Sequence, residues 1–443
     1  MQRKRMDKWK GKELRTFCMF SAGLLFIAAF AMESSKKIML GMGTIISSRD
    51  ALITDYFALA GYGAAFFNAA LMMVISIVLF EVSKIKYTGI TLAALFINTG
   101  FGFWGKNIVN IIPIIFGTWL YAKLHKVSFA RYVYTALFAT CLSPFVTDMV
   151  HILPFEHWIN MILAVSIGIF IGFIMPPLSA HTATMHMGYS LFNVGFSGGT
   201  LAFVMFCILK SFGIESEAVF IWKEGMDPAI MIGTMLYFIF TFLWGVKLEK
   251  GNMKGLYQIM NHSGRAVADF VMMNGPGATL MNMGMMGIAA ETYVILMGGD
   301  LSGPILGCCL TVFGFAAFGA HLKNYIPVLI GVFLSTAFTV YTPHTPGILI
   351  ASLFVVGIAP IAGQFGTVAG ICAGMLHSAI VMCTSQMYGG LNLYNNGFSA
   401  GWVAIIMIPV MESFMDHYKK RKHTTEILKE VIGTIKNKGK DER

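Results

Sequence analysis

The chemically most distinctive segment of the sequence is the polar, glycine-rich stretch from Asn98 to Asn107, which carries Lys106 between two short apolar runs. An ionised side chain is costly in apolar surroundings, so a lysine at such a position is a functional hypothesis in itself. A protonated Lys106 would attract an anion or polarise a carbonyl group. The alternative is that its apolar stem lets the ammonium group reach water.

A second polar signature, Asn-x-Gly-Phe-Ser-small-Gly, occurs twice, beginning at Asn193 and at Asn395. A helix that opens here would present backbone N–H groups and the hydroxyls of Ser197 and Ser399 to a partly or fully negative ligand atom. Asparagine offers both a donor and an acceptor. The same residue types also cap helices, so a ligand-binding role and a capping role are both open.

Two aspartates, Asp55 and Asp269, stand at matching positions before apolar runs. They could hold a coupling cation or a proton, and each could equally be the N-cap of a helix. Amide, imidazole and hydroxyl groups at other polar positions could bind a solute. The predicted solute-binding residues are Asn68, Lys106, Asn107, Asn110, Asn193, Ser197, Asn282, His321, Asn324, Asn395 and Ser399.

The sequence predicts no metal site, no cofactor and no catalytic group. Its seven cysteines include no CxxC pair and no other metal-type spacing. His181 and His186 are not at the i, i+4 spacing that would place two metal ligands on one face of a helix. We therefore expect the candidate residues to bind a ligand without transforming it.

The elements that must position these residues are apolar helices. Of 443 residues, 56% are hydrophobic and only 12% are charged, and long apolar runs follow one another from Thr16 to Met415. A soluble chain would need roughly a quarter of its residues charged, which excludes a soluble enzyme. We expect an all-α, polytopic membrane protein with about 14 transmembrane or half-membrane helices.

The formal net charge of +10 is concentrated at the two ends of the chain, before the first apolar run and after the last. Basic flanks beside apolar spans mark the cytoplasmic side, so both termini are expected in the cytoplasm, with the protein in a bacterial inner membrane. The basic ends, and an amphipathic helix in the tail, would contact the anionic inner leaflet. This distribution does not indicate nucleic-acid binding.

The sequence also repeats itself. Asp55 and the Gly-x-Gly-Ala element that ends at Asn68 recur at one constant offset as Asp269 and the element that ends at Asn282. With an odd number of spans between the copies, the second copy is inverted, as in many transporters. The expected segments are 1–54 (basic start, first span and outer loop), 55–212 (first repeat), 213–268 (connection), 269–414 (second repeat) and 415–443 (basic tail).

Over its whole length the chain resembles a family of bacterial multi-spanning membrane proteins catalogued as a domain of unknown function. More loosely, the segment from Gly102 to Asn107, with Pro144 further on, is similar to the Gly-Leu-x-Gly-Tyr-Asn segment and following proline of urea transporters. Lys106 stands where that family has tyrosine, and the Leu-Pro-x-x-Thr-x-Pro-Phe signature is missing. The resemblance implies a fold of inverted halves and, by analogy, a homo-oligomer, but not urea as the substrate.

These observations favour an integral membrane transporter or channel, and not an enzyme, for a small polar or anionic solute, with the site between the repeats near the membrane midplane. The alternative is a membrane-embedded enzyme that acts on a lipid or isoprenoid head group through histidines such as His181, His186 and His321. A sensor or scaffold is a third possibility. Duplicated polar signatures favour transport.

Overall fold

Apolar runs in a membrane form helices because their backbone N–H and C=O groups must be hydrogen-bonded within the segment. The computed structural model describes residues 11–414, and nine helices in that range are long and apolar enough to cross a membrane. Four shorter apolar helices accompany them. Within this range the extended backbone is limited to three isolated bridges. The all-α membrane fold is therefore confirmed, and the exact number of crossings stays a prediction.

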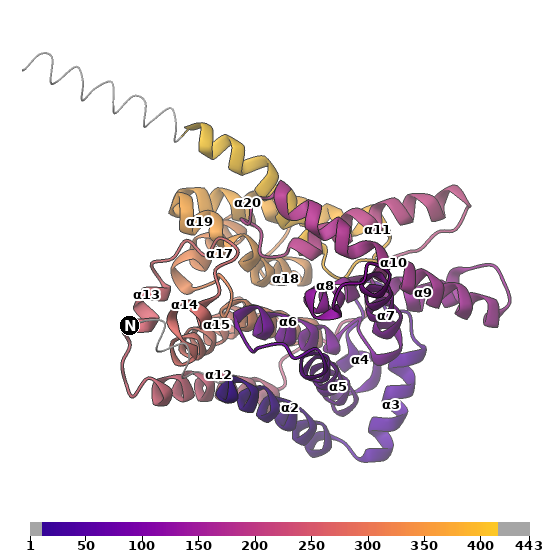
Figure 1. The fold of residues 1–443 in the computed structure, drawn as a ribbon, viewed down its shortest axis with the longest axis horizontal. Coiled ribbons are helices and arrows are strands. Elements are labelled where there is room, and N and C mark those ends of the chain that lie inside the picture. Colours follow the sequence, from indigo (N-terminus) through magenta and orange to yellow (C-terminus); the bar gives the residue numbers. More distant parts are fainter. Residues whose placement is uncertain (1–10, 415–443) are drawn as a thin grey trace, which may run out of the picture.

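In the view of Figure 1, α6 lies near the middle, with first-half helices such as α5 and α8 on one side and α15 of the second half on the other. The first half contains α2 (Lys12–Met32), α3 (Ser35–Ser47), α4 (Tyr56–Ala60), α5 (Tyr62–Val82), α6 (Gly89–Gly100), α7 (Ile108–Leu124), α8 (Val133–Ala139), α9 (Pro144–Ile152), α10 (His157–Met185) and α11 (Asn193–Ser211). The second half contains α12 (Pro228–Leu248), α13 (Lys254–Ile259), α14 (Phe270–Asn274), α15 (Pro276–Leu296), α16 (Gly303–Phe315), α17 (Leu322–Ser335), α18 (Pro346–Phe354), α19 (Ala359–Phe365), α20 (Thr367–Thr384) and a last helix over Asn395–Phe414.

The two halves meet in the core through α6 and α16. A Cβ atom added at Gly100 would collide with the carbonyl group of Gly307, and one added at Gly307 would collide with that of Gly100. The absence of side chains at these two positions therefore lets the two backbones approach closely, as small residues do in membrane helix pairs. Most residues of both helices are fully buried.

Outside this core, α2 packs on α5 and α12 packs on α15. Glu33, which follows α2, fills the space beside Gly63 at the start of α5. Glu249, which follows α12, fills the space beside Gly277 at the start of α15. The matching contacts thus reach beyond the segments that the sequence comparison marked as repeated, because α2 and α12 take corresponding places.

A short interval outside the α-helices, which begins with the 3-10 turn η1 (Phe101–Phe103), separates α6 from α7, and a corresponding interval separates α16 from α17. Gly105 and Gly319 lie in these intervals with φ of +79° and +96°, a conformation that glycine adopts because it has no Cβ atom. The helix breaks predicted beside Lys106 and His321 are therefore present.

The basic start over residues 1–10 and the tail over residues 415–443, including its predicted amphipathic helix, lie outside the described residues. Their placement in the cytoplasm stays a prediction.

Candidate functional site

The first helix break is held in place by Asn68 of α5. Its Nδ2 atom donates hydrogen bonds to the carbonyl oxygens of Gly102 and Lys106, both at 2.7 Å. Asn282 of α15 makes the two corresponding bonds across the second break, at 2.7 and 2.8 Å. Non-helical backbone inside a membrane protein needs such partners. In the described part of the chain, the Oδ1 atoms of both asparagines are buried without a hydrogen-bond partner.

Four further candidate residues cap the helices that follow the breaks. Asn107 Oδ1 accepts from the backbone N–H of Asn110 at 3.1 Å, and Asn110 Oδ1 accepts from that of Asn107 at 2.9 Å. His321 and Asn324 form the same reciprocal arrangement at the start of α17. These are capping boxes, which satisfy backbone donors in the first turn of a helix. Their geometry explains why these residue types occur at these four positions.

The two aspartates cap short helices and also reach across the molecule. Asp55 is the N-cap of α4, and Asp269 is the N-cap of α14. Asp55 Oδ1 also accepts from the N–H of Gly303 at 3.1 Å, whereas Asp269 Oδ1 accepts from that of Gly89 at 2.8 Å. Each carboxylate therefore caps one helix of its own half and one helix of the other half.

The asparagine of each Asn-x-Gly-Phe-Ser motif joins two long helices. Asn193 Oδ1 accepts from Thr182 Oγ1 at 3.0 Å and lies 2.9 Å from His186 Nε2, so it ties α11 to α10. Asn395 makes the equivalent pair of contacts with Thr384 and Tyr388 and ties the last helix to α20. Asn395 is buried, whereas Asn193 is partly exposed.

The two motifs meet each other where α11 crosses the last helix. The backbones touch at Gly195 and Gly397, where an added Cβ atom on either residue would lie less than 3.0 Å from the Cα atom of the other. The rings of Phe196 and Phe398 stack beside this crossing, with centroids 5.9 Å apart. The motif serines bond to neighbouring helices, Ser197 to Thr182 and Ser399 to His377.

Lys106 is fully buried at the boundary between the halves, so its ammonium group does not reach the surface. Its Nζ atom donates to Asn98 Oδ1 at 3.2 Å and to the hydroxyl of Tyr394 at 2.8 Å. It also lies over the rings of Phe101 and Tyr394, 5.3 and 4.7 Å from their centroids. The ion pairs found in the range 11–414 involve Arg15 and Arg49, and none reaches Lys106.

The surroundings of Lys106 are repeated in the other half without their polar groups. Phe101 packs against Tyr394 with centroids 4.7 Å apart, and Phe315 packs against Phe192 in the same way at 4.8 Å. Ala320 takes the position in its helix break that Lys106 takes in the first. The lysine and the hydroxyl that accepts its hydrogen bond therefore occur on one side only.

Sequence reasoning missed two residues of this cluster, Tyr394 and Asn392. Asn392 is fully buried, its Oδ1 atom accepts from the N–H of Tyr394 at 3.1 Å, and its Nδ2 atom has no partner among the described residues. The backbone N–H of Leu393, which lies between these two residues, donates to the carbonyl group of Cys141 at 2.9 Å. One sequence feature could have indicated Tyr394: it precedes the second copy of the motif and has a hydroxyl group, whereas Phe192, which precedes the first copy, has none.

Sequence reasoning also missed Asp50, which is fully buried beside the first break. It accepts hydrogen bonds from the hydroxyl of Tyr56 at 2.6 Å and from the amide groups of Asn107 and Asn110 at 3.0 and 2.9 Å. Backbone carbonyl groups take its place in the second half, where His321 and Asn324 contact residues 262 and 263. A carboxyl group therefore supports only the break that contains Lys106.

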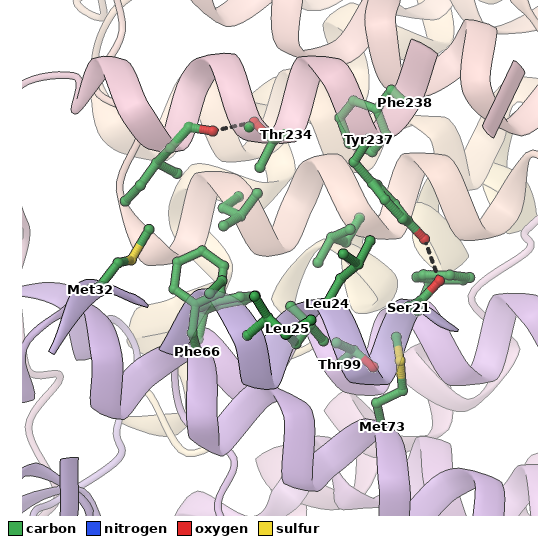
Figure 2. A pocket seen from close by; sticks show the side chains of 18 of the residues that line it. Ser21, Leu24, Leu25, Met32, Phe66, Met73, Thr99, Thr234, Tyr237 and Phe238 are labelled. Atoms are coloured by element: carbon green, nitrogen blue, oxygen red, sulfur yellow. Dashed lines mark hydrogen bonds between the residues drawn. The ribbon is translucent and has the colours of Figure 1, made fainter. Parts of the chain in front are cut away.

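Two cavities differ in size and lining. A cavity of about 280 Å³ lies between α2 and α12, where Ser21 and Tyr237 are joined at 2.7 Å and Thr234 lies further along a mostly apolar wall (Figure 2). The boundary beside Lys106 holds a cavity of only about 10 Å³, lined by residues that include Phe101, Phe192 and Tyr394. That volume admits at most about one water molecule.

Over residues 11–414, no group of three or more His, Cys, Asp or Glu residues is arranged to hold a metal ion. His186 and His321 contact Asn193 and a backbone carbonyl group respectively. Both histidines thus already have hydrogen-bond partners within the protein.

No curated protein matches the chain, and no solved structure matches it. A protein-family model does match, over residues 34–211 and 248–413, which together make up most of the sequence. The matched ranges contain every candidate residue named above. The chain therefore belongs to the family described as a protein of unknown function, DUF1576.

Proposed function

We propose that this multi-pass membrane protein is a carrier for a small polar or anionic solute, built from two inverted repeats with the solute site at their boundary. Transporters of this construction bind their solute near the membrane midplane, where helices are broken. The proposal includes both termini in the cytoplasm of a bacterial inner membrane. It also implies that the protein catalyses no reaction.

The observation that carries the proposal is the exchange of contacts between halves. Asp55 bonds to the start of α16, and Asp269 bonds to the start of α6. When contact i to j is accompanied by the corresponding contact j to i, the two partners are related by a two-fold axis. Three other sets of contacts occur once in each half or between equivalent residues and support the same relation. They are the asparagine bonds across the helix breaks, the bonds of the motif asparagines, and the contact of Gly195 with Gly397.

The direction of α12 supports inversion. Asp55 accepts from the N–H of Lys223, shortly before α12 begins, so α5 starts near that end of α12. Glu249, directly after α12, lies beside Gly277, so α15 starts near the opposite end. The 21 residues of α12 are about 30 Å long, enough to cross the hydrocarbon core. The corresponding helices α5 and α15 then begin on opposite sides of the membrane.

The closed boundary favours a carrier over an open channel. Lys106, Phe101 and Tyr394 are buried there, and the cavity beside them is too small for a hydrated solute. A carrier passes through such an occluded state when one repeat rocks against the other. An open channel would instead need a continuous wet path.

One observation favours the alternative of a lipid-active membrane enzyme. The large apolar cavity between α2 and α12 has the size and lining expected for a hydrocarbon chain. However, the polar groups on its wall are hydroxyls such as those of Ser21, Thr234 and Tyr237. The carboxyl group of Glu291 accepts from Thr234 at 2.9 Å without itself lining the cavity, whereas a hydrolytic or transfer reaction needs an acid or base positioned at the reacting group. We therefore rank transport first.

Flux in proteoliposomes tests the proposal. The purified full-length protein would be reconstituted and exposed to a panel of small solutes that includes formate, nitrate, chloride, bicarbonate and glycerol, with protein-free liposomes as the control. Saturable uptake of at least one solute above the control supports a carrier. A correctly folded, reconstituted protein that moves none of them contradicts the proposal.

A further inference from the structure

We infer that Lys106, Tyr394 and Asn392 form a single binding site for a small monovalent anion, on one side only of the boundary between the halves. The inference deepens the proposed function and rests on it, because it names the class of solute and the residues that would hold it. It concerns side chains from both halves, so the site exists only when the halves are together.

Unused hydrogen-bond donors are the first argument. A lysine ammonium group has three N–H donors, and two of those of Lys106 go to Asn98 and Tyr394. One donor remains. The Nδ2 atom of Asn392 carries two more, and it is buried with no partner in the described region. Buried donors without acceptors are costly, and an anion would supply the missing acceptors.

Charge is the second argument. Lys106 is fully buried, and the acceptors around its ammonium group, Asn98 Oδ1 and the Tyr394 hydroxyl, are neutral. Burying an unpaired charge is strongly unfavourable, and a bound anion would remove this cost. Because one ammonium group is available, a monovalent anion balances the site, whereas a divalent anion would leave an unpaired negative charge.

The contrast with the other half is the third argument. Ala320 and Phe192 stand where Lys106 and Tyr394 stand, and an added Cβ atom at Gly357 would overlap the ring of Phe192. That side is thus filled by a ring and has no charge. Since the same backbone arrangement is stable without the lysine and the hydroxyl, these groups are not required to form the fold.

The backbone that carries Asn392 and Tyr394 can supply the movement that binding needs. It is not helical between η5 (Ser385–Tyr388) and the last helix, and it begins with Gly389 and Gly390 at φ of +56° and +76°. The present cavity of about 10 Å³ is lined by Phe101 and Tyr394 but not by Lys106 or Asn392, and it is too small for an anion with several atoms. Displacement of this segment would open the space beside Lys106.

The test measures anion binding directly. Purified full-length protein in detergent would be titrated with sodium formate and sodium nitrate by calorimetry, with sodium gluconate as a bulky-anion control for ionic strength. We expect saturable binding of formate or nitrate and none of gluconate. Absence of binding by the native protein contradicts the inference.

Two variants locate the site. Lys106→Ala combined with Tyr394→Phe copies the residues of the other half and should therefore fold. It should bind the same anion roughly tenfold more weakly or not at all. Lys123→Met, at an exposed position on α7, is the control and should bind as the native protein does. If the double variant is unstable, Lys106→Met alone replaces it, and unchanged affinity in the folded variant overturns the inference.

Flux separates the two proposals. If the native protein binds the anion, the double variant does not, and the native protein shows no flux in proteoliposomes, the binding site is supported and the carrier is contradicted. If the native protein transports anions and the double variant transports them equally well, the carrier is supported and the site at Lys106 is contradicted.

Discussion

The carboxylate of Asp55 in the first half accepts a hydrogen bond at 3.1 Å from the backbone N–H of Gly303, the residue that opens α16 in the second half. Asp269 and Gly89 make the same bond in the opposite direction, at 2.8 Å. Each aspartate thus fastens one end of the central helix pair, and both are needed for the pair to be held at its two ends.

We expect Asp55→Ala and Asp269→Ala to destabilise the protein by similar amounts, about 1–2 kcal/mol each, because each removes a helix cap and a contact between halves. The measurement is the free energy of unfolding in detergent. Asp227→Ala is the control, since Asp227 caps only α12 and should cost less. An effect of the Asp227 change as large as the other two would argue against the special role of the exchanged contacts.

The crossing of Gly195 and Gly397 predicts a second outcome. Gly195→Ala and Gly397→Ala each place a methyl group against the backbone of the other helix, so each should cost about 1–3 kcal/mol through overpacking. Gly233 of α12 has open space where a Cβ atom would project. Gly233→Ala should therefore be neutral or slightly stabilising. Thermal unfolding of the three variants checks this difference. Unfolding temperatures of Gly195→Ala and Gly397→Ala equal to that of Gly233→Ala would contradict a close contact at the crossing.

Lys106→Met should leave the unfolding temperature unchanged or raise it, even though it removes the proposed anion site. The substitution fills a similar volume and takes away a buried, unpaired ammonium group. Lys106→Ala should lower the unfolding temperature because it leaves a cavity. Lys123→Met, at an exposed position, serves as the control and should have little effect. A large loss of stability in Lys106→Met would mean that the lysine is chiefly structural.

Inversion of the halves predicts opposite labelling of two loops. Glu217→Cys, before α12, and Asn252→Cys, after it, should react with a membrane-impermeant maleimide from opposite sides of the membrane. The positive-inside rule places residue 217 outside and residue 252 in the cytoplasm. Intact cells and inverted membrane vesicles distinguish the two sides, with the native protein as the background control. Labelling of both positions from the same side would contradict the inverted arrangement.

The helical membrane fold and the helix breaks could be predicted from sequence because hydropathy and glycine patterns are local properties. The pairing of α2 with α12 could not, since their correspondence lies in what they pack against, through the glutamates that follow them, Glu33 and Glu249. Tyr394 likewise became visible as a partner of Lys106 only when segments distant in sequence were brought together.

Lys106 itself was identified from sequence because a charge between apolar runs is conspicuous. The roles of Asn107, Asn110, His321 and Asn324 were less readable, since an amide or an imidazole that caps a helix looks the same in sequence as one that would bind a solute. Only the hydrogen-bond partners separate these uses.

The meeting of Gly195 with Gly397 has a consequence for how the two halves could diverge. Under the proposed two-fold relation each of these glycines faces its counterpart, so neither can enlarge while the other stays unchanged. Positions 106 and 320 lie away from that contact, so one can carry a cation while its counterpart is alanine.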